Sequence, residues 1–442
     1  MIKRKILDKA KNFGRLRENF CLEISMPECF PFCAWRYNPK KVKMEDVVAP
    51  PYDIVSEKEI KEFKNKSCYN IFHLELPDSY KKAKELLENW IKSQILIKNK
   101  TPGVYFYELE FLYHNKIFVR KGFILLVKIS PFEEEKIFPH EKTYPNITKD
   151  RFELLKSTHF QFSQIFALYE DPLLETLKIF DKKKELLYKI EYSNEKHRLY
   201  KISEKTSIKK LLSFFKNKKF YIADGHHRYV TALKFKEYME NFYGKNPLKD
   251  YNYVAMYVSP LEDKNLLMLP TYRIYYFNNG RKFIKKISQL AEIVRTLEIK
   301  EEQNFNQFFK KLSQEWAILY KRKIIFFCLK DEVFGKIKEK DQILSQIPLY
   351  NFLQILEDIF KIKEEVLREK GKVKFVSDTR DLIIEAQKGA IGVIFPSISP
   401  QILKKVAQAK KLMPHKCTYF YPKNLTGLIL NEVSGRDLNI SF

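Results

Sequence analysis

Hydrophobic and polar residues follow one another along this chain in patterns that separate helices from strands. In residues 80–97 the apolar positions recur at helical spacing, which predicts a helix. Residues 104–129 alternate and are rich in aromatic and β-branched side chains, which predicts a hairpin of two strands. Ser56 followed by Glu59 has the pattern of a capping box and predicts the start of a short helix. The same criteria predict further helices over 148–157, 206–216 and 226–242, strands over 164–169 and 220–223, and two strands within 185–203.

Helices and strands interleave over the whole length, so we expect a mixed α/β (α+β) fold. At 442 residues the chain is long enough for two or three domains or subdomains. It contains no internal repeat and no Gly/Ser-rich linker. We expect four parts: a basic N-terminal extension (1–25), an N-terminal α/β segment (26–130), a central part (131–275) and a C-terminal α/β segment (276–442).

The composition narrows the class of protein. Apolar residues make up 45% of the chain, and no apolar run reaches the ~20 residues of a membrane span, so we expect neither disorder nor a membrane partner. The basic N-terminus has no apolar stretch followed by a small-residue cleavage site, which favours a cytoplasmic protein.

The formal net charge of +26 raises the question of a nucleic-acid partner, because clustered cations bind phosphate backbones. Only 15 of the 81 basic residues are arginine, however, and lysine is spread over the whole chain. This distribution is typical of a lysine-covered surface. A nucleic-acid partner is therefore an alternative that we do not favour, and the arginines are the more informative cations.

The stretch FYIADGHHRYVTALKF places an acid, a glycine, two histidines and an arginine between a predicted strand and a predicted helix. Unpaired N–H groups and the dipole at a helix N-terminus favour an anion, and Gly225 lets the backbone approach one closely. His227 and Arg228 lie in the first turn, where a guanidinium can hold phosphate oxygens. Asp224 could orient His226 or help to hold a magnesium ion. In the alternative interpretation, Asp224 caps the helix and the histidines bond to neighbouring backbone.

The segment PHEKTYPNITKDRFELL is a second candidate. His140 and Glu141 lie in a proline-flanked loop and could supply a general base or a metal ligand. Asp150 and Arg151 follow near a helix start, where they could position an anion or form a structural ion pair. A solvated loop with a capped helix would give the same pattern.

A third candidate is LMPHKCTYFYPKNLTGLIL, in which Lys416 and Lys423 flank an aromatic cluster. The two lysines could reach a substrate phosphate, or they could be solvated cations beside a core strand. Arg36, in CAWRYNP, could bind an anion or stack in an aromatic pocket. For Arg273, in LLMLPTYRI, we favour a structural ion pair over a ligand contact.

Six motifs occur in an order that resembles a known family. They are FPFCAWRYNP, VVAPPYDIVS, FPHEKTYPNITKDRFELL, ADGHHRYVTAL, LPTYRI and MPHKCTYFYPKNLTGL. Together they resemble the bacterial and archaeal family called domain of unknown function 1015, over about Met26 to Val433, with only a loose likeness across 275–375. Cys417 departs from the family, which more often has serine there. The resemblance also implies a link to serine metabolism, because genes of this family often lie beside serine-biosynthesis genes.

The DGHHR turn and the helix after it also resemble the ParB/sulfiredoxin superfamily, which cradles nucleotide phosphates at such a turn. This likeness implies a ParB-like central part with additional N- and C-terminal α/β segments. Members include nucleases, CTP-binding partition proteins, sulfiredoxins and a free-serine kinase. Sulfiredoxin chemistry does not fit, because its reactive cysteine would fall at His226.

Phosphoryl transfer needs cationic donors, a carboxylate-held metal and a base, and the motifs can supply all three. We therefore expect a phosphotransferase or phosphohydrolase acting on a small phosphorylated metabolite such as serine or phosphoserine, with Mg²⁺ and ATP or ADP as cofactors. The alternatives are a ParB-like nucleic-acid-binding or regulatory protein and a non-catalytic sensor of a small anion. The predicted catalytic residues are His140, Glu141, Asp224 and His226, with Asp224 and Glu141 holding the metal. The predicted phosphate- or substrate-binding residues are Gly225, His227, Arg228, Arg36, Asp150, Arg151, Lys416 and Lys423.

Overall fold

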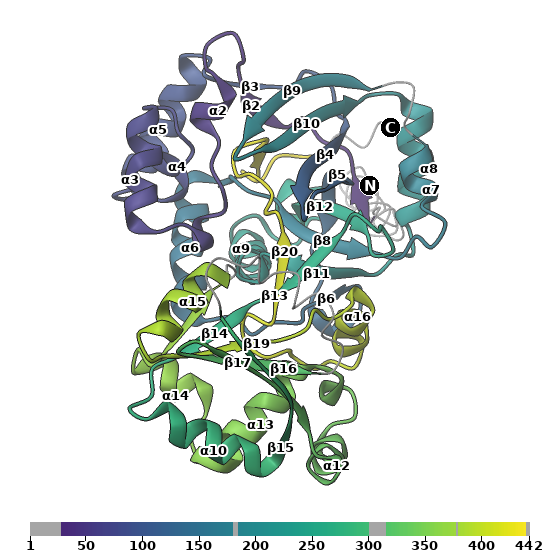
Figure 1. Cartoon of the computed structure of the whole chain (residues 1–442). Helices are drawn as coiled ribbons and strands as arrows, with labels where there is room; N and C mark the ends of the chain where they lie inside the picture. Colours follow the sequence, from purple (N-terminus) through teal and green to yellow (C-terminus); the bar gives the residue numbers. More distant parts are fainter. Residues whose placement is uncertain (1–27, 180–183, 300–314, 377–378, 439–442) are drawn as a thin grey trace, which may run out of the picture.

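Two large β-sheets organise the chain, one above the other in Figure 1. The computed structural model describes residues 28–179, 184–299, 315–376 and 379–438. The predicted basic extension, residues 1–25, lies outside the described residues. The mixture of helices and sheets confirms the mixed α/β fold class.

Within the described residues, the first sheet has nine strands, in the order β6-β11-β8-β12-β5-β4-β10-β9, and β1 pairs with β5. Most neighbours are antiparallel, but β11 is parallel to β6 and β12 is parallel to β8. The strands are β1 (Cys29–Phe30), β4 (Val104–Tyr113), β5 (Lys116–Lys128), β6 (Ile137–Phe138), β8 (Ile165–Tyr169), β9 (Glu185–Tyr192), β10 (Glu195–Ile202), β11 (Phe220–Asp224) and β12 (Tyr253–Pro260).

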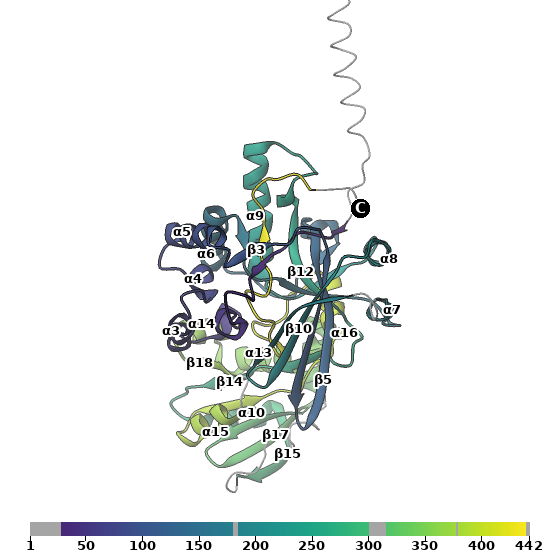
Figure 2. The same ribbon diagram turned by 90° about the horizontal axis from the view of Figure 1, so that it is seen from above.

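Helices cover both faces of the first sheet, with α3 to α5 on one side and α7 and α8 on the other (Figures 1 and 2). The strand pleat explains this arrangement, because successive side chains point to opposite faces. Tyr105 of β4 joins the core cluster that contains Trp90 of α5, whereas Phe106 joins the cluster that contains Phe215 of α8. The helices of this half are α2 (Met44–Val47), α3 (Glu57–Lys66), α4 (Phe72–Glu75), α5 (Tyr80–Lys92), α6 (Pro145–Thr158), α7 (Glu175–Lys178), α8 (Lys205–Phe215) and α9 (His226–Tyr243).

The second sheet, in the order β15-β17-β16-β19-β14-β18, is antiparallel throughout. Its strands are β14 (Tyr272–Tyr275), β15 (Ala291–Glu298), β16 (Trp316–Tyr320), β17 (Lys323–Leu329), β18 (Val373–Val376) and β19 (Ile391–Ile394). Helix α15 packs on one face, and α10 and α13 pack on the other (Figure 1). The helices of this half are α10 (Gly280–Leu290), α12 (Asp331–Lys340), α13 (Pro348–Phe360), α14 (Glu364–Glu369), α15 (Thr379–Gln387) and α16 (Pro400–Gln408).

Short strand pairs tie distant parts of the chain together. Strand β20 (Thr418–Tyr421) returns from the C-terminal part to pair with β13 (Leu267–Pro270), and this ribbon runs between the two sheets (Figure 1). Strand β21 (Asn431–Glu432) pairs with β7 (Phe160–Gln161), and β2 (Trp35–Tyr37) pairs with β3 (Leu96–Lys98). Single helical turns complete the described elements: η1 (Tyr52–Ile54), η2 (Phe132–Glu134), η3 (Asp250–Asn252) and η4 (Leu344–Gln346).

One predicted helix is too long. The segment predicted as helical over 80–97 stays helical only to Lys92, and Gln94 then takes a left-handed conformation with φ 57°. Its last apolar residues form β3 and pair with β2, which is a contact between distant parts of the sequence. None of the described helices is both long and apolar enough to cross a membrane.

Candidate functional site

The DGHHR turn has the strand–glycine–helix geometry that the sequence predicts. Strand β11 ends at Asp224, Gly225 is the N-cap residue with φ +91°, and α9 begins at His226. No side chain caps this helix, so Asp224 does not act as the cap. A Cβ atom at position 225 would lie 2.9 Å from Nε and Nη2 of Arg228. Glycine is therefore required both for the backbone conformation and for the close approach of the guanidinium.

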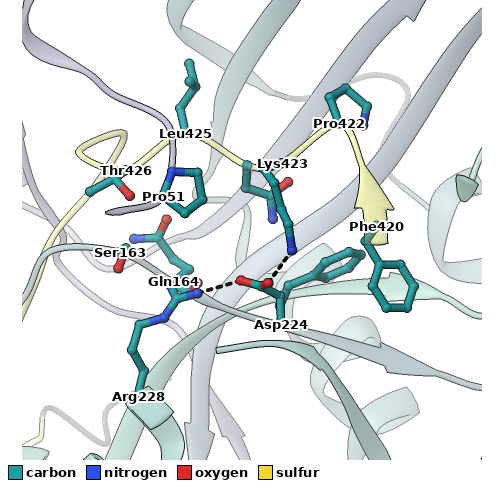
Figure 3. Close-up of a pocket in the computed structure, with 12 residues that line it drawn as sticks. Pro51, Ser163, Gln164, Asp224, Arg228, Phe420, Pro422, Lys423, Leu425 and Thr426 are labelled. Atoms are coloured by element: carbon teal, nitrogen blue, oxygen red, sulfur yellow. Dashed lines mark hydrogen bonds and ion pairs between the residues drawn. The ribbon is translucent and has the colours of Figure 1, made fainter. Parts of the chain in front are cut away.

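Asp224, Arg228 and Lys423 line a small pocket at this turn, which we call the Asp224 pocket (Figure 3). Arg228 donates from Nη2 to Asp224 Oδ2 over 2.8 Å and from Nη1 to the carbonyl of Gln164 over 2.6 Å. Lys423 donates to Asp224 Oδ1 from the other side. The cavity of about 10 Å³ has room for roughly one water molecule. These side chains are only 11–15% exposed, so the pocket is narrow but it is not sealed from solvent.

The charges in the Asp224 pocket support one another. Burial alone would raise the pKa of Asp224, but Lys423 and Arg228 lower it overall. Burial opposes the charge of Lys423, yet Asp224 and Asp53 raise its pKa. Next to the pocket, loss of solvent around the Asp53 carboxyl and the nearby Asp224 carboxylate raise the pKa of Asp53. Asp224 and Lys423 therefore stabilise each other's charged forms, whereas the shift of Asp53 favours its protonated form.

The N- and C-terminal motifs both reach this pocket, as the sequence analysis expects. Pro51 of the VVAPPYDIVS motif lines it, together with the segment that runs from Phe420 to Thr426. Two backbone hydrogen bonds join the motifs, because Thr426 and Ala49 exchange N–H and carbonyl contacts of 2.7 and 3.3 Å. The pocket thus combines segments from distant parts of the chain.

The histidines connect the PHEK loop to the start of α9. His140 Nδ1–H donates to the carbonyl of Ile222 over 2.7 Å, and the His140 backbone N–H donates to His226 Nε2 over 3.2 Å. The backbone N–H of Tyr144 donates to His227 Nε2 over 2.9 Å. His226 and His227 therefore bond to backbone N–H groups, as in the alternative interpretation of the sequence, although these groups belong to the distant PHEK loop. Burial and the neighbouring His140 lower the pKa of His226 to about 3, so that ring is neutral.

Glu141 contacts two histidines, His226 and His415. Its Oε1 is 3.4 Å from Nδ1 of His415 and accepts the backbone N–H of Lys416 over 3.2 Å, and its Oε2 is 3.8 Å from Nδ1 of His226. Burial would raise the pKa of Glu141, but the contacts with His415, His226 and His140 lower it well below its usual range. Glu141 is consequently ionised, and His226 lies between it and the Asp224 pocket.

The two carboxylates predicted to hold a metal face different partners. Asp224 contacts Arg228 and Lys423, whereas Glu141 contacts His415 and the Lys416 amide. Within the described residues, no group of three or more His, Cys, Asp or Glu side chains has the arrangement of a metal site. A magnesium ion would therefore need substrate oxygens as part of its ligand set, as is common for Mg²⁺.

Other predicted binding residues lie outside the Asp224 pocket. Arg36 donates from Nε to Asn99 over 2.9 Å and stacks on Tyr188, which matches the aromatic alternative. The Lys416 side chain is exposed and lies over the Phe375 ring. Neither Arg36 nor Lys416 lines the Asp224 pocket.

Asp150 and Arg151 form the structural ion pair that was the alternative to anion binding. Two guanidinium nitrogens of Arg151 donate to Asp150 Oδ2 over 2.8 and 2.5 Å, and Arg151 Cζ lies 4.8 Å from the centroid of the Tyr52 ring. Arg151 lines a second cavity that adjoins the Asp224 pocket.

Sequence reasoning missed residues that carry no motif of their own. Gln164 supplies a carbonyl to Arg228, and Glu75 faces Arg151. His415 lies inside the MPHK motif, so its position next to the predicted site residue Lys416 was an available signal. Glu75 stands in an unremarkable stretch, FHLELPD, and only the fold reveals its position.

The chain belongs to the family described as protein of unknown function (DUF1015), because the family profile matches residues 29–354, which is more than half of the chain. This confirms the family predicted from the motifs. The last motif, which supplies Lys423, lies beyond the matched residues. The likeness of the turn to ParB proteins stays a prediction. No curated protein matches the chain.

Three solved structures are similar to part of the chain. A free serine kinase in complex with AMP is 10% identical, with a TM-score of 0.33 over 70% of this chain and 91% of that chain. SbnI with a C-terminal truncation from Staphylococcus aureus is 10% identical, with a TM-score of 0.35 over 69% and 85%. A conserved hypothetical protein from Pyrococcus furiosus is 11% identical, with a TM-score of 0.32 over 68% and 93%. Such low TM-scores carry no functional argument, so we argue function from the site.

Proposed function

We propose that this protein is a phosphotransferase or phosphohydrolase that binds the phosphate of a small metabolite in the Asp224 pocket. One observation carries the proposal: Arg228 and Lys423 converge at the uncapped N-terminus of an 18-residue helix, in a pocket that is narrow and open to solvent. Helix N-termini and cationic donors both favour phosphate, and together they form the kind of electrostatic cradle that phosphoryl transfer requires.

Asp224 is the resident counter-ion of this cradle. An ammonium has three N–H donors and a guanidinium has five, whereas the contacts described above use one on Lys423 and two on Arg228. Because the pocket has room for about one water molecule, a phosphate shares both cations with Asp224 only after the Lys423 side chain moves. Asp224 would also be a carboxylate ligand for a Mg²⁺ ion, which would neutralise phosphate charge.

His140 is the candidate for handling protons, and Glu141 is the candidate for orienting the histidines. Glu141 is ionised and lies 3.8 Å from His226, but its lowered pKa makes it a weak proton acceptor. His140 keeps Nε2 free of a proton because Nδ1 donates to a carbonyl, and Thr418 Oγ1 is 3.4 Å from that nitrogen. ATP or ADP would be the phosphate donor or acceptor, and Mg²⁺ would neutralise the transferred group.

The direct test measures phosphate exchange with the full-length protein. Serine with labelled ATP or ADP, and phosphoserine alone, are the substrates to try, because the motif resemblance links the family to serine metabolism. We expect Mg²⁺-dependent transfer or release of phosphate that Lys423→Met reduces by about 100-fold, as for the loss of one transition-state cation. Lys410→Met, on an exposed lysine paired with Glu135, is the matched control. Absence of both nucleotide binding and phosphate exchange would exclude the proposal.

Asp224→Asn separates binding from catalysis. The variant keeps the shape of the side chain but removes the charge that competes for Arg228 and Lys423. We expect inorganic phosphate to bind about 10-fold more tightly, a difference of ~1.4 kcal/mol, while phosphate exchange falls because the metal-holding carboxylate is gone. Calorimetric titration with phosphate measures the first effect. Weaker phosphate binding in this variant would contradict the role of Asp224 as a resident counter-ion.

A further inference from the structure

A second cavity adjoins the Asp224 pocket and shares Ser163 and Arg228 with it. Its remaining wall is mostly apolar and includes Leu154, Phe162 and Val254, but one end carries the Glu75 and Arg151 side chains. We call it the Glu75 cavity. Because Ser163 and Arg228 line both spaces, the Glu75 cavity and the Asp224 pocket lie next to each other.

Glu75 is a buried carboxylate next to an apolar wall, which is an unusual environment for an acidic side chain. Its side chain is only 4% exposed, and its Oε2 accepts no hydrogen bond of ordinary geometry from the described residues. Burial raises the pKa of Glu75, while Arg151, Arg228 and the nearby Ser163 hydroxyl counteract part of that rise. A buried carboxylate oxygen without a donor costs free energy, so an external donor at this place would be favourable.

Arg151 does not fully neutralise Glu75. Its Nη1 is 3.6 Å from Glu75 Oε1, whereas two of its nitrogens hold Asp150 Oδ2 at 2.8 Å or less. One guanidinium thus serves two carboxylates. Arg228, the next cation, is engaged by Asp224 and the Gln164 carbonyl. The charged side chains that line this cavity are thus Glu75, Arg151 and Arg228, and aspartates already engage both guanidinium groups. Glu75 Oε2 is left without a donor, so a small group with N–H donors is the complementary ligand group.

We infer that the Glu75 cavity binds the ammonium group of the substrate, so that the metabolite is a short phosphorylated amine or an amino alcohol. This inference rests on the proposed function, because it places the phosphate of the same molecule in the Asp224 pocket. The ammonium donates to Glu75 Oε2, and its carbon stem packs against Leu154 and Phe162. Arg228 lies between the two ends and contacts both compartments.

The size of the cavity limits the length of this ligand. A volume of about 50 Å³ holds roughly four water-sized groups. An ammonium, a stem of two carbons and one small substituent fill that space. Larger amines, and amines with bulky side chains, exceed it.

Two matched phosphates test the inference on the full-length wild-type protein. O-phosphoethanolamine and ethyl phosphate share the phosphate and the two-carbon stem and differ only in the ammonium group. We expect calorimetric titration to show O-phosphoethanolamine binding about 10-fold more tightly or better. Equal affinities would overturn the ammonium site and leave phosphate binding intact. Failure of both compounds to bind would remove the proposed function together with the inference.

Glu75→Gln identifies the group that recognises the amine. We expect this variant to lose the preference for O-phosphoethanolamine while it keeps the wild-type affinity for ethyl phosphate. Glu88→Gln, on the exposed face of α5, is the control and should keep the full preference. A preference that survives in Glu75→Gln would overturn the assignment. If Glu75→Gln does not fold, the wild-type comparison of the two phosphates still decides whether the ammonium is recognised.

Discussion

Gly225 shows how one residue can set the geometry of the whole site. Its φ of +91° is costly for any side chain with a Cβ, and that Cβ would also push against the Arg228 guanidinium. We expect Gly225→Ala to lower the free energy of unfolding by about 1–3 kcal/mol and to weaken phosphate binding because Arg228 is displaced. Denaturant unfolding and calorimetric phosphate titration measure the two effects.

Gly335→Ala is the matched control for that substitution. Gly335 lies inside α12 with open space where a Cβ would stand. Alanine should stabilise this helix by about 0.5–1 kcal/mol without changing phosphate affinity. Unchanged phosphate affinity in Gly225→Ala would show that the position of Arg228 does not depend on the glycine.

His226 makes stability depend on pH in a definite direction. The native protein keeps this buried ring neutral with a pKa of about 3, whereas the unfolded chain binds a proton below its ordinary pKa of about 6.5. Protons therefore favour the unfolded state, and stability that is present above that value is lost as the pH falls. Between about pH 7.5 and 5.5 we expect a loss of ~1.4 kcal/mol from His226.

Urea unfolding at the two pH values measures this loss. Burial lowers the pKa of His140 as well, so it adds a loss in the same direction. His226→Gln should make the pH dependence shallower. A free energy of unfolding that does not change over this range would mean that the imidazole is accessible to protons in the native state.

At the scale of the element, the local pattern of apolar and polar residues predicted correctly those helices and hairpins that form within one continuous segment. The predicted hairpin over 104–129 corresponds to β4 and β5, and the predicted helix over 206–216 corresponds to α8, shifted by one residue. The DGHHR turn was predictable because glycine, strand and helix signals coincide within a few residues. The range 80–97 failed because short apolar runs do not distinguish a helix from a strand, and pairing with β2 decided the outcome.

The sequence motifs predicted which residues are candidates for the site, but they did not predict the contacts between those residues. The sequence brought Asp224, Arg228 and Lys423 together as candidates, but nothing in it showed that one carboxylate would bind both cations. Arg36 has the same chemistry as Arg228 and nevertheless packs on Tyr188. Glu75 was not predictable, because its importance comes from burial and from contacts made across the fold. Such long-range contacts leave no local pattern in a single sequence.

The capping box of α3 is an element that the sequence defines completely. Ser56 accepts the N–H of Glu59 over 3.3 Å, and Glu59 accepts the N–H of Ser56 over 2.7 Å. We expect Ser56→Ala to cost about 1 kcal/mol, because the hydroxyl that accepts the Glu59 N–H and donates to the Glu59 carboxylate is lost. Thermal unfolding followed by circular dichroism measures the cost. Phosphate binding should not change, and a change would mean that α3 positions the neighbouring Tyr52 turn.

At the scale of the molecule, Arg273 connects the second sheet to the C-terminal motif. Its guanidinium is fully buried, pairs with Glu364 over 3.1 Å and donates to the carbonyls of His415 and Lys416 over 2.6 and 3.3 Å. This confirms the structural ion pair favoured from the sequence. The segment that carries Lys423 to the first sheet is therefore anchored on the second, so loss of Arg273 should affect both halves of the protein.

Arg273→Ala leaves Glu364 buried without its cation and removes the donors to two carbonyls. We expect a loss of stability of about 3–5 kcal/mol and weaker phosphate binding, because the segment before Lys423 loses its anchor. Arg281→Ala, on an exposed arginine of α10, should change stability by less than about 0.5 kcal/mol. Differential scanning calorimetry and phosphate titration on the same samples separate the two effects. A destabilised Arg273→Ala protein with wild-type phosphate affinity would show that the Asp224 pocket is positioned by the first sheet alone.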